Sequence, residues 1–174
     1  MKKITIIGAG TMGKIFLQAC QNIFSGAKIT ATVNSDESVQ KLKQEFTSIE
    51  VLQDNRQAVE NSDLTILACK PQNFLEVAKE IKGSLKQDVL VISVMAGVSL
   101  KKLKGDLEIE KAVRTMPNLG ARVGKSMTTW TCLGQVGEED KNIIKKLLSS
   151  MGEELFLETE EKLNKANAYI NSIH

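Results

Sequence analysis

Several residue types are scarce in this 174-residue chain, and each scarcity excludes a kind of site. The three cysteines are odd in number and far apart, so they support neither a disulfide framework nor a zinc site. We expect Cys20, Cys69 and Cys132 to be small buried hydrophobic residues. The only histidine, His174, is the last residue, and we expect no chemical role for it. The sequence therefore predicts no metal site.

The chain also lacks a large excess of charge of one sign, and it lacks long apolar runs. The net charge is only +2, and no lysine or arginine cluster is interleaved with aromatic residues, so we predict no nucleic-acid partner. No apolar stretch approaches the roughly 18 residues of a membrane span, and the short run at residues 4–7 leads into a glycine turn rather than a cleavage site. We therefore expect a cytoplasmic protein without membrane contact. Only two prolines are present, and no interdomain linker is evident.

Glycines are placed with a clear pattern near the amino terminus. Gly8, Gly10 and Gly13 form a Gly-x-Gly-x-x-Gly turn directly after an apolar run at residues 4–7. In a nucleotide-binding turn the first glycine allows the tight bend, the second lets a pyrophosphate approach bare backbone, and the third lets the helix pack on the strand. The phosphates then meet the unpaired N–H groups of a helix N-terminus.

The context of this turn supports a nucleotide site over a plain glycine turn without a ligand, which is the alternative. Apolar residues recur at helical spacing from Met12 to Ile23, and a second apolar strand follows at residues 28–33. Strand, glycine turn, helix and strand in this order form one βαβ unit.

The rest of the chain predicts a doubly wound, mostly parallel α/β sheet of the Rossmann type. The expected strands are residues 4–7, 28–33, 49–52, 64–68, 89–94, 112–115, 127–131 and 155–157. Helical apolar spacing marks further helices around residues 39–46, 74–81 and 143–151. We expect residues 1–159 to form the dinucleotide-binding domain, with residues 160–174 beginning a helical domain.

In such a sheet the ligand lies at the carboxyl ends of the strands. After the second strand, Asn34 and Ser35 stand where an NAD site usually has a carboxylate for the ribose 2′-hydroxyl. Uncharged side chains do not repel a 2′-phosphate, which favours NADP, yet no arginine is present to bind it strongly. NAD stays an alternative. Asp36 is either a displaced ribose ligand or a cap for the next helix.

Three further motifs follow the later strands: Ala-x-Lys-Pro at residues 68–71, Ser-x-x-Ala-Gly-Val at residues 93–98, and Arg-x-Met-Pro-Asn at residues 114–118. Together with the glycine turn, their order and spacing resemble pyrroline-5-carboxylate reductase, from residue 1 to about residue 160. The resemblance implies reduction of a cyclic imine in proline biosynthesis by hydride transfer from NADPH or NADH. A full-length member of that family is expected to form a homo-oligomer and to use a small-molecule imine as substrate.

The resemblance also implies which residues bind the cofactor. The pyrophosphate is expected at Gly8, Ala9, Gly10, Thr11, Met12 and Gly13, and the adenosine at Asn34, Ser35 and Asn55. The ribose and nicotinamide are expected at Ala68, Cys69, Lys70, Pro71, Val94, Met95, Ala96 and, closing the nicotinamide end, Asn118. No catalytic residue is assigned. Each segment also has a plainer interpretation: Pro71 as the first residue of a helix, Lys70 as a solvated lysine, and residues 116–118 as a loop.

The end of the chain departs from the resemblance. Family members usually continue into a helical domain that contributes the substrate pocket, and the apolar residues Leu163, Ala166, Ile170 and Ile173 resemble only its lead-in. We therefore expect cofactor binding with weak or no turnover, and self-association or docking through this apolar stripe. A stand-alone NADP(H)-binding module and a different dehydrogenase with the same first domain are the alternatives.

Overall fold

The computed structural model describes residues 1–118, 120 and 124–172, so the predictions made for Ile173 and His174 lie outside the described residues. The described strands are β1 (Lys3–Ile7), β2 (Lys28–Thr32), β3 (Glu50–Leu52), β4 (Leu64–Leu67), β5 (Leu90–Ser93), β6 (Lys111–Met116), β7 (Ser126–Cys132) and β8 (Gly152–Phe156). They form one sheet in the order β3-β2-β1-β4-β5-β6-β7-β8. The first six follow the Rossmann order, so the predicted doubly wound fold is confirmed.

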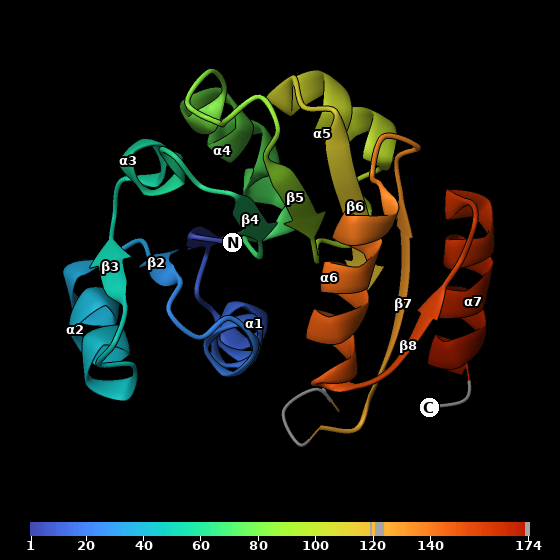
Figure 1. Ribbon diagram of the computed structural model, residues 1–174, viewed down its shortest axis with the longest axis horizontal. Coiled ribbons are helices and arrows are strands. Elements are labelled where there is room, and N and C mark those ends of the chain that lie inside the picture. Colours follow the sequence, from blue (N-terminus) through green and yellow to red (C-terminus); the bar gives the residue numbers. More distant parts are fainter. Residues whose placement is uncertain (119, 121–123, 173–174) are drawn as a thin grey trace.

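Helices cover both faces of this sheet (Figure 1). They are α1 (Thr11–Ile23), α2 (Asp36–Glu45), α3 (Asn55–Val59), a 3₁₀ turn η1 (Pro71–Asn73), α4 (Phe74–Ile81), α5 (Leu100–Leu107), α6 (Glu138–Ser149) and α7 (Glu160–Ser172). Two apolar cores lie on opposite faces of the sheet, one beneath α1, α2 and α6 and the other beneath α3, α4 and α5. Each strand of the sheet's centre is therefore buried on two sides, which explains why it reads as a continuous apolar run.

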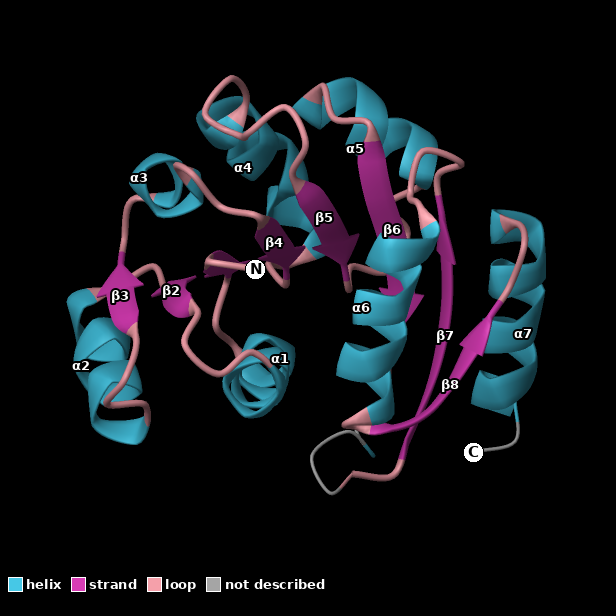
Figure 2. Ribbon diagram, in the orientation of Figure 1, coloured by secondary structure: helices cyan, strands magenta, loops and turns pink. Residues whose placement is uncertain are grey.

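The last two strands break the parallel pattern, as the strand arrows show (Figure 2). β1 to β6 are parallel to one another, whereas β7 pairs antiparallel with β6 and parallel with β8. No helix is described between β6 and β7, and antiparallel neighbours need no crossover helix. Trp130 of β7 packs its ring 4.6 Å from that of Phe156 in β8, which fixes this edge to the core under α6.

Helix α7 packs on the sheet face opposite α6 (Figure 1). Leu163 is completely buried, and the Thr129 hydroxyl donates a 2.9 Å hydrogen bond to the Asn167 side chain across the α7–β7 contact. The chain's own sheet covers Leu163. This part of the predicted apolar stripe is therefore not available for docking. Ala166 and Ile170 are half-buried.

Sequence patterns located every described strand but missed two helices. α3 and α5 were not predicted, because α3 has only five residues and α5 carries three lysines and a glycine among its eight. Both are capped by side chains: Asp54 accepts from the Gln57 N–H, and Ser99 accepts from the Lys102 N–H. None of the helices in the described ranges is long and apolar enough to cross a membrane.

Candidate functional site

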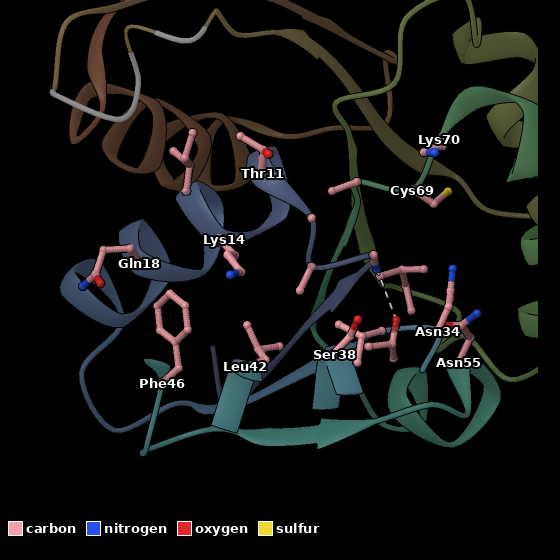
Figure 3. A pocket seen from close by; sticks show the side chains of 18 of the residues that line it. Thr11, Lys14, Gln18, Asn34, Ser38, Leu42, Phe46, Asn55, Cys69 and Lys70 are labelled. Atoms are coloured by element: carbon pink, nitrogen blue, oxygen red, sulfur yellow. Dashed lines mark hydrogen bonds between the residues drawn. The ribbon is translucent and has the colours of Figure 1, made fainter. Parts of the chain in front are cut away.

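A cleft of about 1160 Å³ opens at the carboxyl ends of β1, β2 and β4, between α1, α2 and α4 (Figure 3). β1 lies between β2 and β4, so the chain crosses to opposite sides of β1 in its first and second halves. This is the topological switch point at which doubly wound sheets bind ligands. The position of the cleft therefore follows from the strand order alone.

Two glycines of the turn are required by close backbone approach. Gly8 has φ of +85°, and a Cβ there would lie 2.9 Å from the Cα and N atoms of Cys69. A Cβ at Gly13 would overlap the carbonyl oxygen of Gly8. Gly10 differs, because a Cβ there would meet nothing within 4 Å. The turn thus leaves open space at Gly10, on the cleft side.

The amino terminus of α1 faces this space. Gly10 is its N-cap and offers no side-chain cap, and no acidic residue lies in the first turn. The Lys14 N–H bonds the Gly10 carbonyl, so the helix itself supplies no acceptor for the N–H groups of the three preceding residues. Uncapped N–H groups and the positive end of the helix dipole suit a bound anion such as a pyrophosphate.

The end of β2 presents Asn34 to the cleft but not Ser35 or Asp36. Ser35 is the N-cap of α2, accepting from the Ser38 N–H at 3.2 Å. The Asp36 carboxylate instead accepts from Gln53 Nε2 at 2.5 Å. The alternative that Asp36 caps this helix is therefore wrong, because the preceding serine takes that position.

Asn55 lines the cleft at the start of α3 and is held there by Glu80 of α4. The Asn55 backbone N–H and its Nδ2 both donate to the Glu80 carboxylate, at 3.2 and 2.9 Å. One N–H of the Asn55 amide is bonded to Glu80, so its second N–H and its oxygen can bind a ligand. Figure 3 shows Asn55 beside Asn34.

The β4–α4 corner supplies Ala68, Cys69 and Lys70 to the cleft. Pro71 lies outside the lining and begins η1, which supports the plainer interpretation that it starts a helix. The Cys69 thiol lies 3.5 Å from the Met95 sulfur, and burial raises the pKa of this thiol above its ordinary value. The Cys69 thiol is therefore uncharged near neutral pH, so it lines the cleft as a neutral group and not as a thiolate.

The cleft brings together nine of the predicted cofactor residues: Gly8, Ala9, Gly10, Thr11, Asn34, Asn55, Ala68, Cys69 and Lys70. Outside its lining are the other eight: Met12, Gly13, Ser35, Pro71, Val94, Met95, Ala96 and Asn118. Met12 and Val94 pack against the core under α1, and Met95 is buried under α4 and α5. The Asn118 side chain accepts from the Gly120 N–H within its own loop.

Sequence reasoning missed the side chains that helices contribute to this cleft. They include Lys14 and Gln18 of α1, Ser38, Lys41 and Glu45 of α2, and Glu76 and Glu80 of α4. Lys14 and Glu45 form a 2.5 Å ion pair across the cleft between α1 and α2. The available signal was their spacing of three or four residues along each helix, which places them on one face.

Within residues 1–118, 120 and 124–172, no three histidine, cysteine, aspartate or glutamate side chains form a group that could hold a metal ion. Cys20 is buried, which raises the pKa of its thiol to about 12, while Cys132 is half-buried.

Comparisons with known proteins agree with this geometry. Residues 3–97 match the family model described as NADP oxidoreductase coenzyme F420-dependent. The pyrroline-5-carboxylate reductase of Vibrio alginolyticus is 32% identical over 173 residues, covering 98% of this chain and 63% of that protein.

Solved structures resemble the chain over a similar extent. A pyrroline-5-carboxylate reductase from Coxiella burnetii superposes with a TM-score of 0.86 at 28% identity, covering 98% of this chain and 66% of that one. The Plasmodium falciparum pyrroline carboxylate reductase solved with NADP bound shares the fold, with a TM-score of 0.75 at 20% identity, and this chain covers 66% of it.

The chain thus spans about two thirds or less of the length of these relatives. The resemblance predicted from the four ordered motifs is confirmed by both kinds of comparison. The chain belongs to the oxidoreductase family described as NADP oxidoreductase coenzyme F420-dependent, and over nearly its whole length it is similar to the amino-terminal part of pyrroline-5-carboxylate reductases.

Proposed function

We propose that the cleft binds NADP(H) in preference to NAD(H), and that this site serves reduction of a cyclic imine of the pyrroline-5-carboxylate type. The observation that supports this most is the meeting of three segments far apart in sequence: residues 8–11, Asn34 and residues 68–70 line one cleft at the switch point of the sheet. Relatives named for this reaction include one that is 32% identical over 173 residues and one that shares the fold with a TM-score of 0.86.

Residues of the chain have distinct roles in this proposal. The backbone of Gly8 to Thr11 and the amino terminus of α1 hold the pyrophosphate. Asn34 and the side-chain amide of Asn55 contact the adenosine ribose. When bound, the cofactor supplies a hydride to the imine carbon, while the ring nitrogen gains a proton.

Only some of the residues expected at the nicotinamide end line the cleft. Ala68, Cys69 and Lys70 form the cleft wall there, and residues 94–96 and Asn118 lie outside the lining. Hydride transfer gains much of its rate from holding donor and acceptor in register. We therefore expect the 174 residues alone to bind the cofactor and to turn over weakly. The same feature favours the second candidate function, an NADP(H)-binding module without catalysis.

Two measurements on the purified chain separate these functions. Calorimetric titration with NADPH is expected to show binding with a dissociation constant on the order of micromolar, about −8 kcal/mol. NADPH oxidation with pyrroline-5-carboxylate, beside a boiled control, is then followed by absorbance. Turnover on the order of 1 per second or more would show that these residues complete the substrate site. Binding without turnover would favour the module, and absence of binding to either dinucleotide would refute both.

A further inference from the structure

We propose that Ser38 and Lys41, on the cleft-facing side of α2, bind the phosphate on the ribose 2′-hydroxyl and so determine the preference for NADP(H). This inference rests on the proposed function, because it assigns a ligand group to two residues within the same cleft. Neither residue belongs to the four motifs of the sequence.

Ser38 and Lys41 both line the cleft, together with Asn34 at the end of β2. They are three residues apart on α2, which places them on the same face of the helix. Figure 3 shows the Ser38 and Asn34 side chains on the same wall of the cleft. Lysine side chains in helices lean toward the helix amino terminus, so the Lys41 ammonium is carried toward Asn34.

The present partner of Lys41 is easily exchanged. Its Nζ lies 2.5 Å from the carboxylate of Glu37, one turn earlier in α2, and the two side chains are 70% and 77% exposed. Exposed ion pairs of this kind contribute little free energy. A phosphate dianion carries more charge than a carboxylate, so it can replace Glu37 as the partner of the ammonium.

The other charged side chains near the adenosine end are already engaged. Asp36, the carboxylate nearest the end of β2, accepts from Gln53 and lies outside the cleft lining. Lys14 is paired with Glu45 at the far end of α2. Among the described residues that line the cleft, none therefore offers a free carboxylate at the end of β2 for a ribose 2′-hydroxyl. Ser38 and Lys41 supply the hydroxyl and cation that a 2′-phosphate needs, in place of the arginine that the sequence lacks there.

Cofactor titrations of four variants test this assignment. Lys41→Met is expected to weaken NADPH binding roughly tenfold and to change NADH binding less than about twofold, because only NADPH carries the 2′-phosphate. Ser38→Ala is expected to weaken NADPH binding by about threefold. Glu37→Gln is expected to strengthen NADPH binding, because it removes the competing carboxylate. Lys43→Met is the matched control, since Lys43 is an exposed lysine of α2 outside the cleft lining.

Two fragments of the cofactor, one with and one without the 2′-phosphate, show whether the loss of affinity in Lys41→Met comes from that phosphate. Adenosine 2′,5′-bisphosphate should show the same loss in Lys41→Met as NADPH, whereas 5′-AMP should show none. Equal changes for NADPH and NADH, or no change for either, in a Lys41→Met protein with an unaltered circular dichroism spectrum would overturn the inference alone. Failure of the unmodified chain to bind either dinucleotide would instead overturn the proposed function and this inference together.

Discussion

Replacing Gly10 with valine should strongly weaken cofactor binding while leaving the fold intact. Gly10 is the N-cap of α1, with φ of −77° and ψ of −156°, a conformation that any L-residue adopts. A Cβ there meets no atom within 4 Å, so the valine side chain would occupy the open cleft and not displace protein. That space is where we place the pyrophosphate.

The expected magnitudes differ sharply for binding and for stability. A hydrogen bond to a charged group is worth about 1.5–3 kcal/mol, so losing two such bonds from the α1 N–H groups costs roughly 3 kcal/mol or more. This corresponds to a dissociation constant raised at least about a hundredfold. Valine is a poorer N-cap than glycine by about 1 kcal/mol, which lowers the melting temperature by only roughly 2–4 °C in a chain of this size.

Isothermal titration with NADPH and a thermal melt measure the two effects on the same protein. Gly137→Val is the matched control, because Gly137 is the N-cap of α6, has φ of −78° and ψ of 176°, and also has open space at its Cβ. It lies outside the cleft lining, so this variant should keep its affinity. Undiminished NADPH binding by Gly10→Val, or an equal loss in both variants, would refute the placement of the pyrophosphate.

Three further changes probe other parts of the structure. Gly13→Ala should destabilise the fold by about 1–3 kcal/mol, because its Cβ would overlap the Gly8 carbonyl oxygen, and urea unfolding measures this. Glu80→Ala should weaken NADPH binding roughly fivefold by releasing Asn55, in a calorimetric titration. Asp63→Asn should lower the melting temperature at pH 7, because a bond from Lys86 and two backbone N–H groups hold the Asp63 pKa below its ordinary value. That stabilisation is present above the unfolded pKa of about 3.9 and disappears as the pH falls through the folded pKa.

Each of these three predictions would be contradicted by a specific result. Unchanged unfolding of Gly13→Ala would mean that α1 does not approach the turn as closely as described. If Glu80→Ala weakens binding further in a protein that already carries Asn55→Ala, Glu80 does not act through Asn55. A constant difference in melting temperature between Asp63→Asn and the unmodified protein from pH 7 down to pH 2 would exclude the linkage proposed for Asp63.

The strands of the sheet could be predicted because they are apolar runs. The directions of the strands could not all be predicted from the sequence. Short apolar runs such as residues 64–68 are typical of strands that are buried on both faces of a sheet, and the helical spacing between the runs indicates alternating strands and helices. The antiparallel direction of β7 is not encoded in its own residues, because it depends on how the chain connects β6 to β7. β8 begins earlier than expected, at Gly152, because polar edge residues such as Glu153 hide the strand pattern.

The candidate site combines residues at strand ends, which the sequence predicts, with residues on helix faces, which it does not. Residues directly after a strand, such as Asn34 and Cys69, were predicted to lie together because parallel strands end at one edge. Lys41 and Glu80 were missed, since a charged residue on a helix usually indicates a solvated face. Only the packing of α2 and α4 beside the switch point shows which of their charged side chains face the cleft.

Arg114, the first residue of the Arg-x-Met-Pro-Asn motif, is a buried residue that forms an ion pair. Its guanidinium is buried and pairs with Glu160 of α7 at 3.0 Å, and the same Glu160 oxygen accepts from the Leu100 N–H at the start of α5. One carboxylate thus joins β6, α5 and α7. Residues 94–96, which are expected to line the ribose and nicotinamide, lie in the loop that leads into α5, so this contact fixes the position of α7 relative to that loop. The arginine of the Arg-x-Met-Pro-Asn motif therefore links β6 to α5 and α7 through Glu160.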